Sequence, residues 1–542
     1  MDEKSLFWTD QLADLIIKRS KYNHIDKKFI NPKILTIKSS TSISGVPHIG
    51  NASDVIRHNA VVQALQDKGK KVRFIWVAED MDPWRKVPSG IPEKFSKYIG
   101  MPVSSLPDPE GCCKNYVEHF VSLFLDSLME NFGTKPIFYS TTEAYKKGVF
   151  KKHIRKALEN LDEVKRIVGK FRKDLPEDYS PWKPVCENCG KIITTRIKEV
   201  KKDGVDYECK DYEFKEYGKE AYNKVKGCGY KGFSDIKKGN GKLLWNIEWA
   251  AEWDAWKVVL EGAGKEHFMP TSSFWRAGEI CEKIFDWIEP YPGKNPIQPY
   301  EYIMFEGSKM SASKGNVVAT WEWPKFAPPE LLRLIFLKKP NKVRDFKFVD
   351  VGRAVDEIDK LEKIYFGLDK ENEEDDSKRL FESINIKVPK KYRDPINFSF
   401  LAMLSQVYDS FEKCVPVLKK LDHKIVDKEF TKKRFEQAKE WVNKYAPDYM
   451  RFKVVDKVEV KLDEQEKKAL KLLMNKLEKN KYDEESLFNE FYKICSEVEI
   501  NNVDFFKAAY KVLINKEKGP RLASFILAIG KEKVIKLLKQ IK

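Results

Sequence analysis

Two apolar runs with a helical pattern between them lie near the start of this chain. Residues 33–38 (KILTIK) and 71–78 (KVRFIWVA) have the composition of short buried strands. Between them, after a loop rich in Ser, Thr and Gly, apolar residues recur at near-helical spacing: Val55, Ile56, Ala60, Val61 and Leu65. Strand, helix and strand at this spacing predict a βαβ unit, and therefore a parallel sheet with a right-handed crossover.

His48 lies where the loop of this unit enters the helix, in the tetrapeptide His48-Ile49-Gly50-Asn51. Free backbone N–H groups and the helix dipole point out of a helix start, so the position suits a phosphate. An imidazole there could donate to a phosphate oxygen on which negative charge develops. Gly50 removes a side chain where a base or ribose would approach the backbone. Taken alone, His48 is more simply explained as a solvated residue at a helix start.

A second motif, Lys309-Met310-Ser311-Ala312-Ser313, lies far downstream in a Ser- and Gly-rich loop. The flexible ammonium of Lys309 could follow a pyrophosphate as it departs, and the hydroxyls of Ser311 and Ser313 could add donors. The alternative is an ordinary basic surface loop. The longer run KMSASKGN is specific enough to favour the functional interpretation.

Length and composition predict several domains. A chain of 542 residues exceeds one ordinary core. Lys and aromatic residues become frequent from about residue 95 to 241, and beyond a charged stretch at 369–378, expected to be an exposed loop, the pattern is almost wholly helical. We predict a first half of a Rossmann-type α/β catalytic domain (1–95), an insertion (96–240), the second half (241–300), the region of the Lys309 loop (301–355) and a helical domain (356–542).

Four of the nine cysteines gather in the predicted insertion. The pair Cys186-x-x-Cys189 has the spacing of a zinc knuckle, Cys209 follows it, and Cys228 lies in a Gly-Cys-Gly turn. Four thiolates with no open position predict a structural Zn²⁺ site, whereas the alternative is a set of free buried cysteines. His153 is a further candidate ligand. The other cysteines and their odd total do not indicate a secreted disulfide framework.

Charge and hydropathy indicate the partners and the compartment. Lys and Arg number 100 against 83 Asp and Glu, and a net charge of +17 favours a polyanion such as RNA, although a Lys-rich composition with no partner remains the alternative. The sequence has no apolar run of ~20 residues, which argues against a membrane span. The N-terminus lacks a secretory signal pattern. We therefore expect a cytoplasmic protein, and a monomer.

Aromatic and acidic residues crowd one segment: Trp245, Glu248, Trp249, Glu252, Trp253, Asp254 and Trp256. Carboxylates and aromatic rings together suit an aliphatic cation, with acid for the charge and rings for the stem. For most of these positions the simpler interpretation is a core helix or strand with a solvated acidic face.

The two motifs resemble the HIGH and KMSKS signatures of class I aminoacyl-tRNA synthetases. Nearly end to end, the chain resembles the class I lysyl-tRNA synthetases, on these further segments: residues 79–83, 85–88, 106–112, 245–249, 264–267, 441–447 and 519–522. Members usually carry Gly, Pro and Asp where Ser40, Ile43 and Glu266 stand here. An insertion between Cys209 and Cys228 also splits the second cysteine pair of the family.

The resemblance implies roles for individual residues. ATP, with Mg²⁺, would be held by His48, Gly50 and Asn51, with Lys309, Met310, Ser311 and Ser313 closing over its phosphates. Gly264 and Glu266 would approach the ribose. The lysine pocket would be lined by Ser42, Trp245, His267 and Tyr300. The helical C-terminal domain would read the anticodon of lysine tRNA.

The sequence therefore predicts a lysine–tRNA ligase that first forms lysyl-adenylate and then charges the tRNA. One alternative keeps the fold but activates another amino acid, such as glutamate. A glutamate pocket needs a cationic side chain, so the acidic, Trp-rich segment argues against it. The other alternative is a catalytically silent RNA-binding protein, which the intact His48 and Lys309 argue against.

Overall fold

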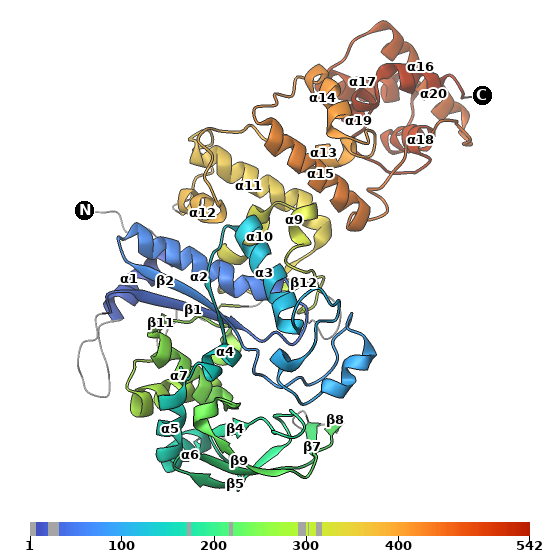
Figure 1. Cartoon of the computed structure of the whole chain (residues 1–542). Coiled ribbons are helices and arrows are strands. Elements are labelled where there is room, and N and C mark those ends of the chain that lie inside the picture. The colour runs from blue at the N-terminus through green and yellow to red at the C-terminus, as the bar shows by residue number, and fades with distance from the viewer. Residues whose placement is uncertain are drawn as a thin grey trace. The chain divides into compact units, whose positions relative to one another are not determined.

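The computed structural model describes residues 7–19, 32–170, 175–215, 221–290, 300–301, 303–310, 317–374 and 376–541 (Figure 1). The chain divides into two compact units. The first comprises Met1–Glu322, Leu332–Phe346 and Glu374–Ile386, and the second comprises Trp323–Leu331, Lys347–Glu373 and Lys387–Lys542. Among the described residues, no helix combines the length and the apolar character needed to span a bilayer.

A four-stranded parallel sheet forms the centre of the first unit, in the strand order β11-β1-β2-β3. Its strands are β1 (Leu35–Thr41), β2 (Val72–Ala78), β3 (Ile137–Ser140) and β11 (Val258–Leu260). Nearly every side chain of β1 is buried, as expected for a parallel strand covered on both faces. The predicted α/β class and βαβ unit are confirmed. β3 joins this sheet although it lies within the range 96–240 assigned to an insertion.

Helix α2 makes the connection from β1 to β2 and packs against both strands. The helices of the first unit are α1 (Trp8–Arg19), α2 (Ile49–Asp67), α3 (Tyr116–Phe132), α4 (Thr141–Lys146), α5 (Lys151–Glu159), α6 (Leu161–Gly169), α7 (Trp245–Trp256), α8 (Ser273–Ile280) and α12 (Ser377–Ile384). Helices α7 and α8 pack on each other, so α7 is buried along most of its length.

Small sheets make up much of the remainder of the first unit (Figure 1). Strands β4 (Trp182–Pro184) and β10 (Gly241–Leu243) pair antiparallel, as do β7 (Tyr212–Lys215) and β8 (Ala221–Val225). Strands β5 (Thr195–Lys201), β6 (Gly204–Cys209) and β9 (Lys231–Asp235) form a three-stranded antiparallel sheet. Strand β12 (Ile303–Phe305), just before Lys309, pairs in parallel with β13 (Arg344–Phe346).

The second unit is helical. Its helices include α9 (Trp323–Phe326), α11 (Val351–Tyr365), α13 (Phe398–Leu404), α14 (Phe411–Lys420), α15 (Lys428–Lys444), α16 (Glu464–Lys479), α17 (Glu484–Val498), α18 (Asn502–Ile514), α19 (Leu522–Ile529) and α20 (Lys531–Leu538), while α10 (Pro329–Leu337) lies at the division of the chain. Asp427, Asp463 and Asp483 each accept a backbone N–H at a helix start, which satisfies an otherwise unpaired donor. The prediction of a helical C-terminal domain is confirmed.

Candidate active site

His48 is the residue at which α2 begins, and its ring takes part in the helix cap. The backbone N–H of Gly50 donates to His48 Nδ1 at 3.0 Å, and the backbone N–H of His48 donates to Asn51 Oδ1 at 3.0 Å. Burial lowers the pKa of His48 to about 4, so the imidazole is neutral at pH 7. Because Nδ1 accepts a hydrogen bond, the ring proton lies on Nε2. His48 therefore offers one N–H donor at the start of a helix.

A contact with His48, which the sequence did not reveal, explains why position 50 is a glycine. A Cβ at this position would lie 2.7 Å from His48 Cε1 and 2.8 Å from His48 Nδ1, closer than real side chains approach. The space that glycine leaves is thus occupied by the imidazole itself. Gly50 also lines the cavity described next, so the prediction that it leaves room for a base or ribose is neither supported nor contradicted by its contact with His48.

The two sequence motifs meet around one cavity of about 350 Å³. The backbone N–H of Ile49 donates to Val318 O at 3.0 Å, and His48 forms an antiparallel bridge with Ala319, just after the Lys309 motif. The cavity is lined by His48, Gly50, Asn51, Ser53, Asp54, Arg57, Ala263, Gly264, Glu266, His267, Tyr300, Glu301, Ile303, Phe305, Lys309, Met310 and Phe336, and we call it the nucleotide cavity. Ser311 and Ser313 lie outside the described residues.

Paired charges line the walls of the nucleotide cavity. Lys309 Nζ lies 3.3 Å from Glu266 Oε1, and both side chains are largely exposed. Tyr300 donates its hydroxyl hydrogen to Asp54, and the guanidinium of Arg57 lies 4.2 Å from the centre of the Tyr300 ring. Burial raises the pKa of Asp54 to about 6, although Tyr300 and Arg57 act in the opposite direction.

A second cavity, of about 370 Å³, opens beside the first. It is lined by Ser40, Thr41, Ser42, Asp54, Glu79, Asp82, Arg85, Trp245, Trp249, Glu261, Gly262, Ala263 and His267, and we call it the acidic cavity. Asp54, Ala263 and His267 line both cavities. The acidic cavity lies at the carboxyl ends of β1, β2 and β11, where open parallel sheets bind their ligands.

The predicted lysine-pocket residues divide between the cavities. Ser42 and Trp245 line the acidic cavity, and His267 lines both. Tyr300 is 5% exposed and lines the nucleotide cavity rather than the acidic one. Its place is fixed by the hydrogen bond to Asp54, a long-range contact that sequence spacing could not reveal.

Helix α7 supplies the aromatic wall of the acidic cavity. The rings of Trp245 and Trp249 stack with centroids 5.0 Å apart and an interplanar angle of 24°. The interpretation of the acidic residues of this helix as a solvated face was wrong, because Glu248, Glu252 and Asp254 are all buried. Each forms an ion pair with a lysine of another element, namely Lys242, Lys38 and Lys152, respectively, of which Lys152 is exposed.

Lys38, on β1, is a buried cation that the sequence analysis missed. Its Nζ lies 2.7 Å from Glu261 Oε1, 2.8 Å from Glu252 Oε2 and 3.8 Å from Glu79 Oε1. Burial would lower the pKa of Lys38, but the three carboxylates outweigh it and hold the pKa well above its usual range. The only signal in the sequence was a lysine in an apolar strand, which is common on half-exposed strands.

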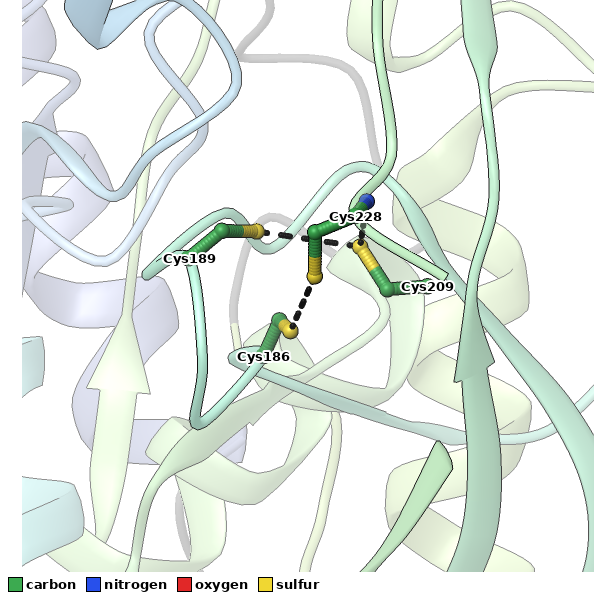
Figure 2. Close-up of side chains that lie close together, drawn as sticks. All are labelled: Cys186, Cys189, Cys209 and Cys228. Atoms are coloured by element: carbon green, nitrogen blue, oxygen red, sulfur yellow. Dashed lines mark hydrogen bonds between the residues drawn. The ribbon is translucent and has the colours of Figure 1, made fainter. Parts of the chain in front are cut away.

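The four cysteines of the predicted zinc site come together (Figure 2). Cys186 Sγ lies 3.6 Å from Cys228 Sγ, and Cys189 Sγ lies 3.7 Å from Cys209 Sγ. These separations exclude disulfides and match the sulfur–sulfur spacing of roughly 3.8 Å that follows from tetrahedral Zn–S bonds. The donor set therefore fits a closed metal site. His153 is not part of it, because His153 Nε2 bonds to Asp254 Oδ2 at 2.7 Å.

A second cluster of possible metal ligands was not predicted. Asp108, Cys112, Cys113 and His119 each bring one ligand atom within 4.8 Å of the others. Cys112 Sγ lies 3.2 Å from His119 Nδ1, and His119 Nδ1 lies 3.3 Å from Asp108 Oδ1. The adjacent cysteines were visible in the sequence, but the histidine one turn into α3 carried no signal of its own. One carboxylate, two thiols and one imidazole suit a divalent metal such as zinc.

A parallel sheet that places a histidine at a helix start and a basic loop around one cavity is the arrangement of class I aminoacyl-tRNA synthetases. Residues 6–387 match the family model described as tRNA synthetases class I (K), and residues 429–542 match an anticodon binding domain. The chain belongs to the class I lysyl-tRNA synthetase family.

Named relatives match over nearly the whole chain. The lysine–tRNA ligase of Methanosphaera stadtmanae is 31% identical over 98% of this chain and 99% of its own length. That of Thermococcus kodakarensis is 33% identical, with the same coverage of 98% and 99%. A glutamate tRNA ligase structure from Elizabethkingia meningosepticum matches 94% of this chain and 99% of its own at 12% identity, with a TM-score of 0.42, which is too distant to inform the site.

Proposed function

We propose that the two cavities of the first unit hold the two substrates of an ATP-dependent lysine–tRNA ligase. Lysine carboxylate attacks the α-phosphate of ATP to give lysyl-adenylate and pyrophosphate, and the 3′-terminal ribose of tRNA then attacks the adenylate carbonyl. The observation that carries this proposal is that His48 and Lys309 line one cavity, which shares a wall with a neighbouring acidic and Trp-lined cavity.

ATP belongs in the nucleotide cavity. Apolar side chains that line it, Ile303, Phe305, Met310 and Phe336, suit the adenine ring. The Nε2–H of His48 would donate to an α-phosphate oxygen as negative charge develops there. Asn51 holds the backbone of His48 in place for this role. Mg²⁺ bound with ATP would neutralise part of the phosphate charge.

Lys309 would change partners during the reaction. Without nucleotide its ammonium pairs with Glu266 across 3.3 Å, and the phosphates would compete for it. Its release would leave Glu266, beside Gly264, to accept hydrogen bonds from the ribose hydroxyls. Ser311 and Ser313 are proposed to add hydroxyl donors, in agreement with the family motif. Positioning and charge stabilisation, rather than covalent catalysis, would supply most of the rate.

Lysine belongs in the acidic cavity. The stacked rings of Trp245 and Trp249 would pack on the aliphatic stem, and Ser42 and His267 line the same cavity. Asp54 lines both cavities and therefore lies nearest to the reacting end of the amino acid. We assign the α-ammonium of lysine to Asp54, with Tyr300 orienting that carboxylate through its hydroxyl.

The second unit would bind tRNA, because residues 429–542 match an anticodon binding domain. The net charge of +17 on the whole chain favours a polyanionic partner. We propose the domain limits 1–95, 96–240, 241–300, 301–355 and 356–542, with β3 of the second range as part of the central sheet, and we propose a monomer with a cytoplasmic location. We propose a structural zinc ion at Cys186, Cys189, Cys209 and Cys228, and a second metal at Asp108, Cys112, Cys113 and His119.

ATP–pyrophosphate exchange across the amino acids tests this function. Assayed both with and without added tRNA, lysine should support exchange well above every other amino acid in at least one of the two conditions. Exchange with glutamate and none with lysine would favour the first alternative, a related enzyme for another amino acid. No exchange with any amino acid, in the presence of tRNA, would favour a catalytically silent RNA-binding protein.

A further inference from the structure

We propose that Glu79 is the residue that binds the side-chain ammonium of the amino-acid substrate and thereby selects lysine. The inference rests on the proposed function of the acidic cavity, and it identifies which carboxylate reads the feature that distinguishes lysine. Glu79 directly follows β2, at the carboxyl end of the central sheet, and its side chain is only 3% exposed.

Three of the four carboxylates that line the acidic cavity already have close partners. Asp54 accepts the hydroxyl hydrogen of Tyr300, and Asp82 Oδ1 lies 2.5 Å from Lys242 Nζ. Glu261 accepts from Lys38 Nζ at 2.7 Å and from Trp253 Nε1 at 2.6 Å. Asp82 and Glu261 are therefore committed to the cavity wall, while Asp54, held by Tyr300, lies where the two cavities meet and is assigned to the α-ammonium.

Glu79 differs from the other three. Neither of its carboxylate oxygens has a hydrogen-bond partner among the residues that the structure describes. Its nearest cation, Lys38, stays 3.8 Å away because Glu252 and Glu261 hold that ammonium at 2.8 Å and 2.7 Å. A buried carboxylate without donors is costly to maintain, and a ligand cation would remove that cost.

The local charge balance also calls for a cation. Glu79, Glu252 and Glu261 face the single buried ammonium of Lys38, and Glu248 and Asp82 share Lys242. The group therefore holds five carboxyl groups for two lysines, and burial raises the pKa of Glu252 to about 8, so a bound cation would stabilise the ionised forms. Arg85 is the cationic side chain that lines the acidic cavity. Burial, with Glu252 nearby, raises the pKa of Glu79 well above its usual range, and a bound ammonium would reverse that shift.

The place of Glu79 matches the far end of the substrate. The reacting carboxylate must face the nucleotide cavity, so the α-carbon belongs near the shared residues Asp54, Ala263 and His267. Glu79 lines the acidic cavity but not the nucleotide cavity. A lysine with its α-ammonium at Asp54 would carry its stem past Trp245 and Trp249 and end with its second ammonium at Glu79.

The isosteric substitution Glu79→Gln tests this assignment. Norleucine has the lysine skeleton without the side-chain amine, so it serves as the matched ligand. We would measure kcat/KM for lysine by pyrophosphate exchange and Ki for norleucine as a competitor. The variant should lose lysine kcat/KM on the order of 10²–10³-fold, because the ligand ammonium would be buried without its counter-ion. Norleucine Ki should change by less than about threefold.

Two further variants separate recognition from structure. Glu79→Asp keeps the charge but retracts it, so its lysine kcat/KM should fall between those of the wild type and Glu79→Gln. Glu252→Gln removes a buried charge of the same group that does not line the cavity, and the preference for lysine over norleucine should fall less than about tenfold. Because neither carboxylate oxygen of Glu79 accepts a hydrogen bond from the described residues, Glu79→Gln should not lower the Tm.

Equal losses for lysine and norleucine, or a lower Tm that accounts for the lost activity, would show that Glu79 is structural and overturn the inference. So would an unchanged lysine preference in Glu79→Gln. A large loss of preference in Asp82→Asn alone would place the ammonium at Asp82 instead. If the wild type itself failed to activate lysine, the proposed function would fail, a result distinct from any failure of Glu79.

Discussion

Gly50→Ala should abolish most adenylate formation without unfolding the protein. The new Cβ would lie 2.7 Å from His48 Cε1, whereas ordinary contacts begin at 3.4 Å, so the imidazole must move or rotate. The movement would break the hydrogen bond from Gly50 N–H to His48 Nδ1. The same movement would displace the Nε2–H group of His48 from the position in which we propose that it donates to the α-phosphate.

The two consequences differ in size. Loss of the cap costs about 1 kcal/mol of stability, and an alanine in place of glycine within a helix returns nearly as much, so the net stability change should be small. Loss of an aligned donor to a developing anion costs about 3–4 kcal/mol in the transition state, or 10²–10³-fold in rate. The rate of adenylate formation should therefore fall by about 10²–10³-fold, whereas the Tm should change little.

A double-mutant cycle with His48→Ala, measured by lysine-dependent pyrophosphate exchange, tests the reasoning. If Gly50 acts through the imidazole, Gly50→Ala should cost almost nothing in the His48→Ala background. Gly169→Ala is a matched control, because among the residues that the structure describes its Cβ would meet only Leu175 Cδ1, at 3.8 Å. Multiplicative losses in the double variant would refute this role and favour a direct approach of the nucleotide to Gly50.

Three other outcomes are expected. Lys309→Ala should lower the exchange rate on the order of 10²–10³-fold with little change in lysine KM, and a pure KM effect would contradict its phosphate role. Cys189→Ser should lower both Tm and zinc content, measured by mass spectrometry, whereas Cys281→Ser, buried elsewhere, should leave the zinc content unchanged; equal metal contents in the two variants would exclude the zinc site. Because burial raises the pKa of Asp54 from 3.8 to about 6, its neutral form stabilises the fold fully below about pH 4, and this contribution is lost as the pH rises through 6. The free energy of unfolding of Asp54→Asn, measured in urea, should thus rise relative to that of the wild type by up to about 3 kcal/mol between pH 4 and pH 7. A difference between the two proteins that does not depend on pH would contradict the raised pKa of Asp54.

Local patterns predicted the parts of the fold that depend on local physics. The apolar runs and the helical spacing between them predicted β1, α2 and β2, and the loop-to-helix position of His48 followed from them. The Cys186 and Cys189 pair likewise predicted a site that Cys209 and Cys228 join in the structure. Both the βαβ unit and the Cys186-x-x-Cys189 pair are formed by residues that lie close together in the sequence, so their pattern is visible without the rest of the fold.

Long-range pairing was beyond a single sequence. Glu252 of α7 was interpreted as part of a solvated face, but its counter-ion Lys38 lies on β1, more than two hundred residues earlier. Tyr300 was predicted to line the lysine pocket; it lines the nucleotide cavity and donates its hydroxyl hydrogen to Asp54, which lines both cavities. Nothing in the spacing of these residues records that they meet, because the meeting is set by the packing of the whole sheet.

A structure of the full chain bound to a non-hydrolysable lysyl-adenylate analogue would show directly whether the two cavities act together. The adenosine should occupy the cavity of His48 and Lys309, and the lysyl side chain should run between Trp245 and Glu79. An adenosine bound elsewhere, or a lysyl chain directed away from the acidic cavity, would contradict the proposed division of the site.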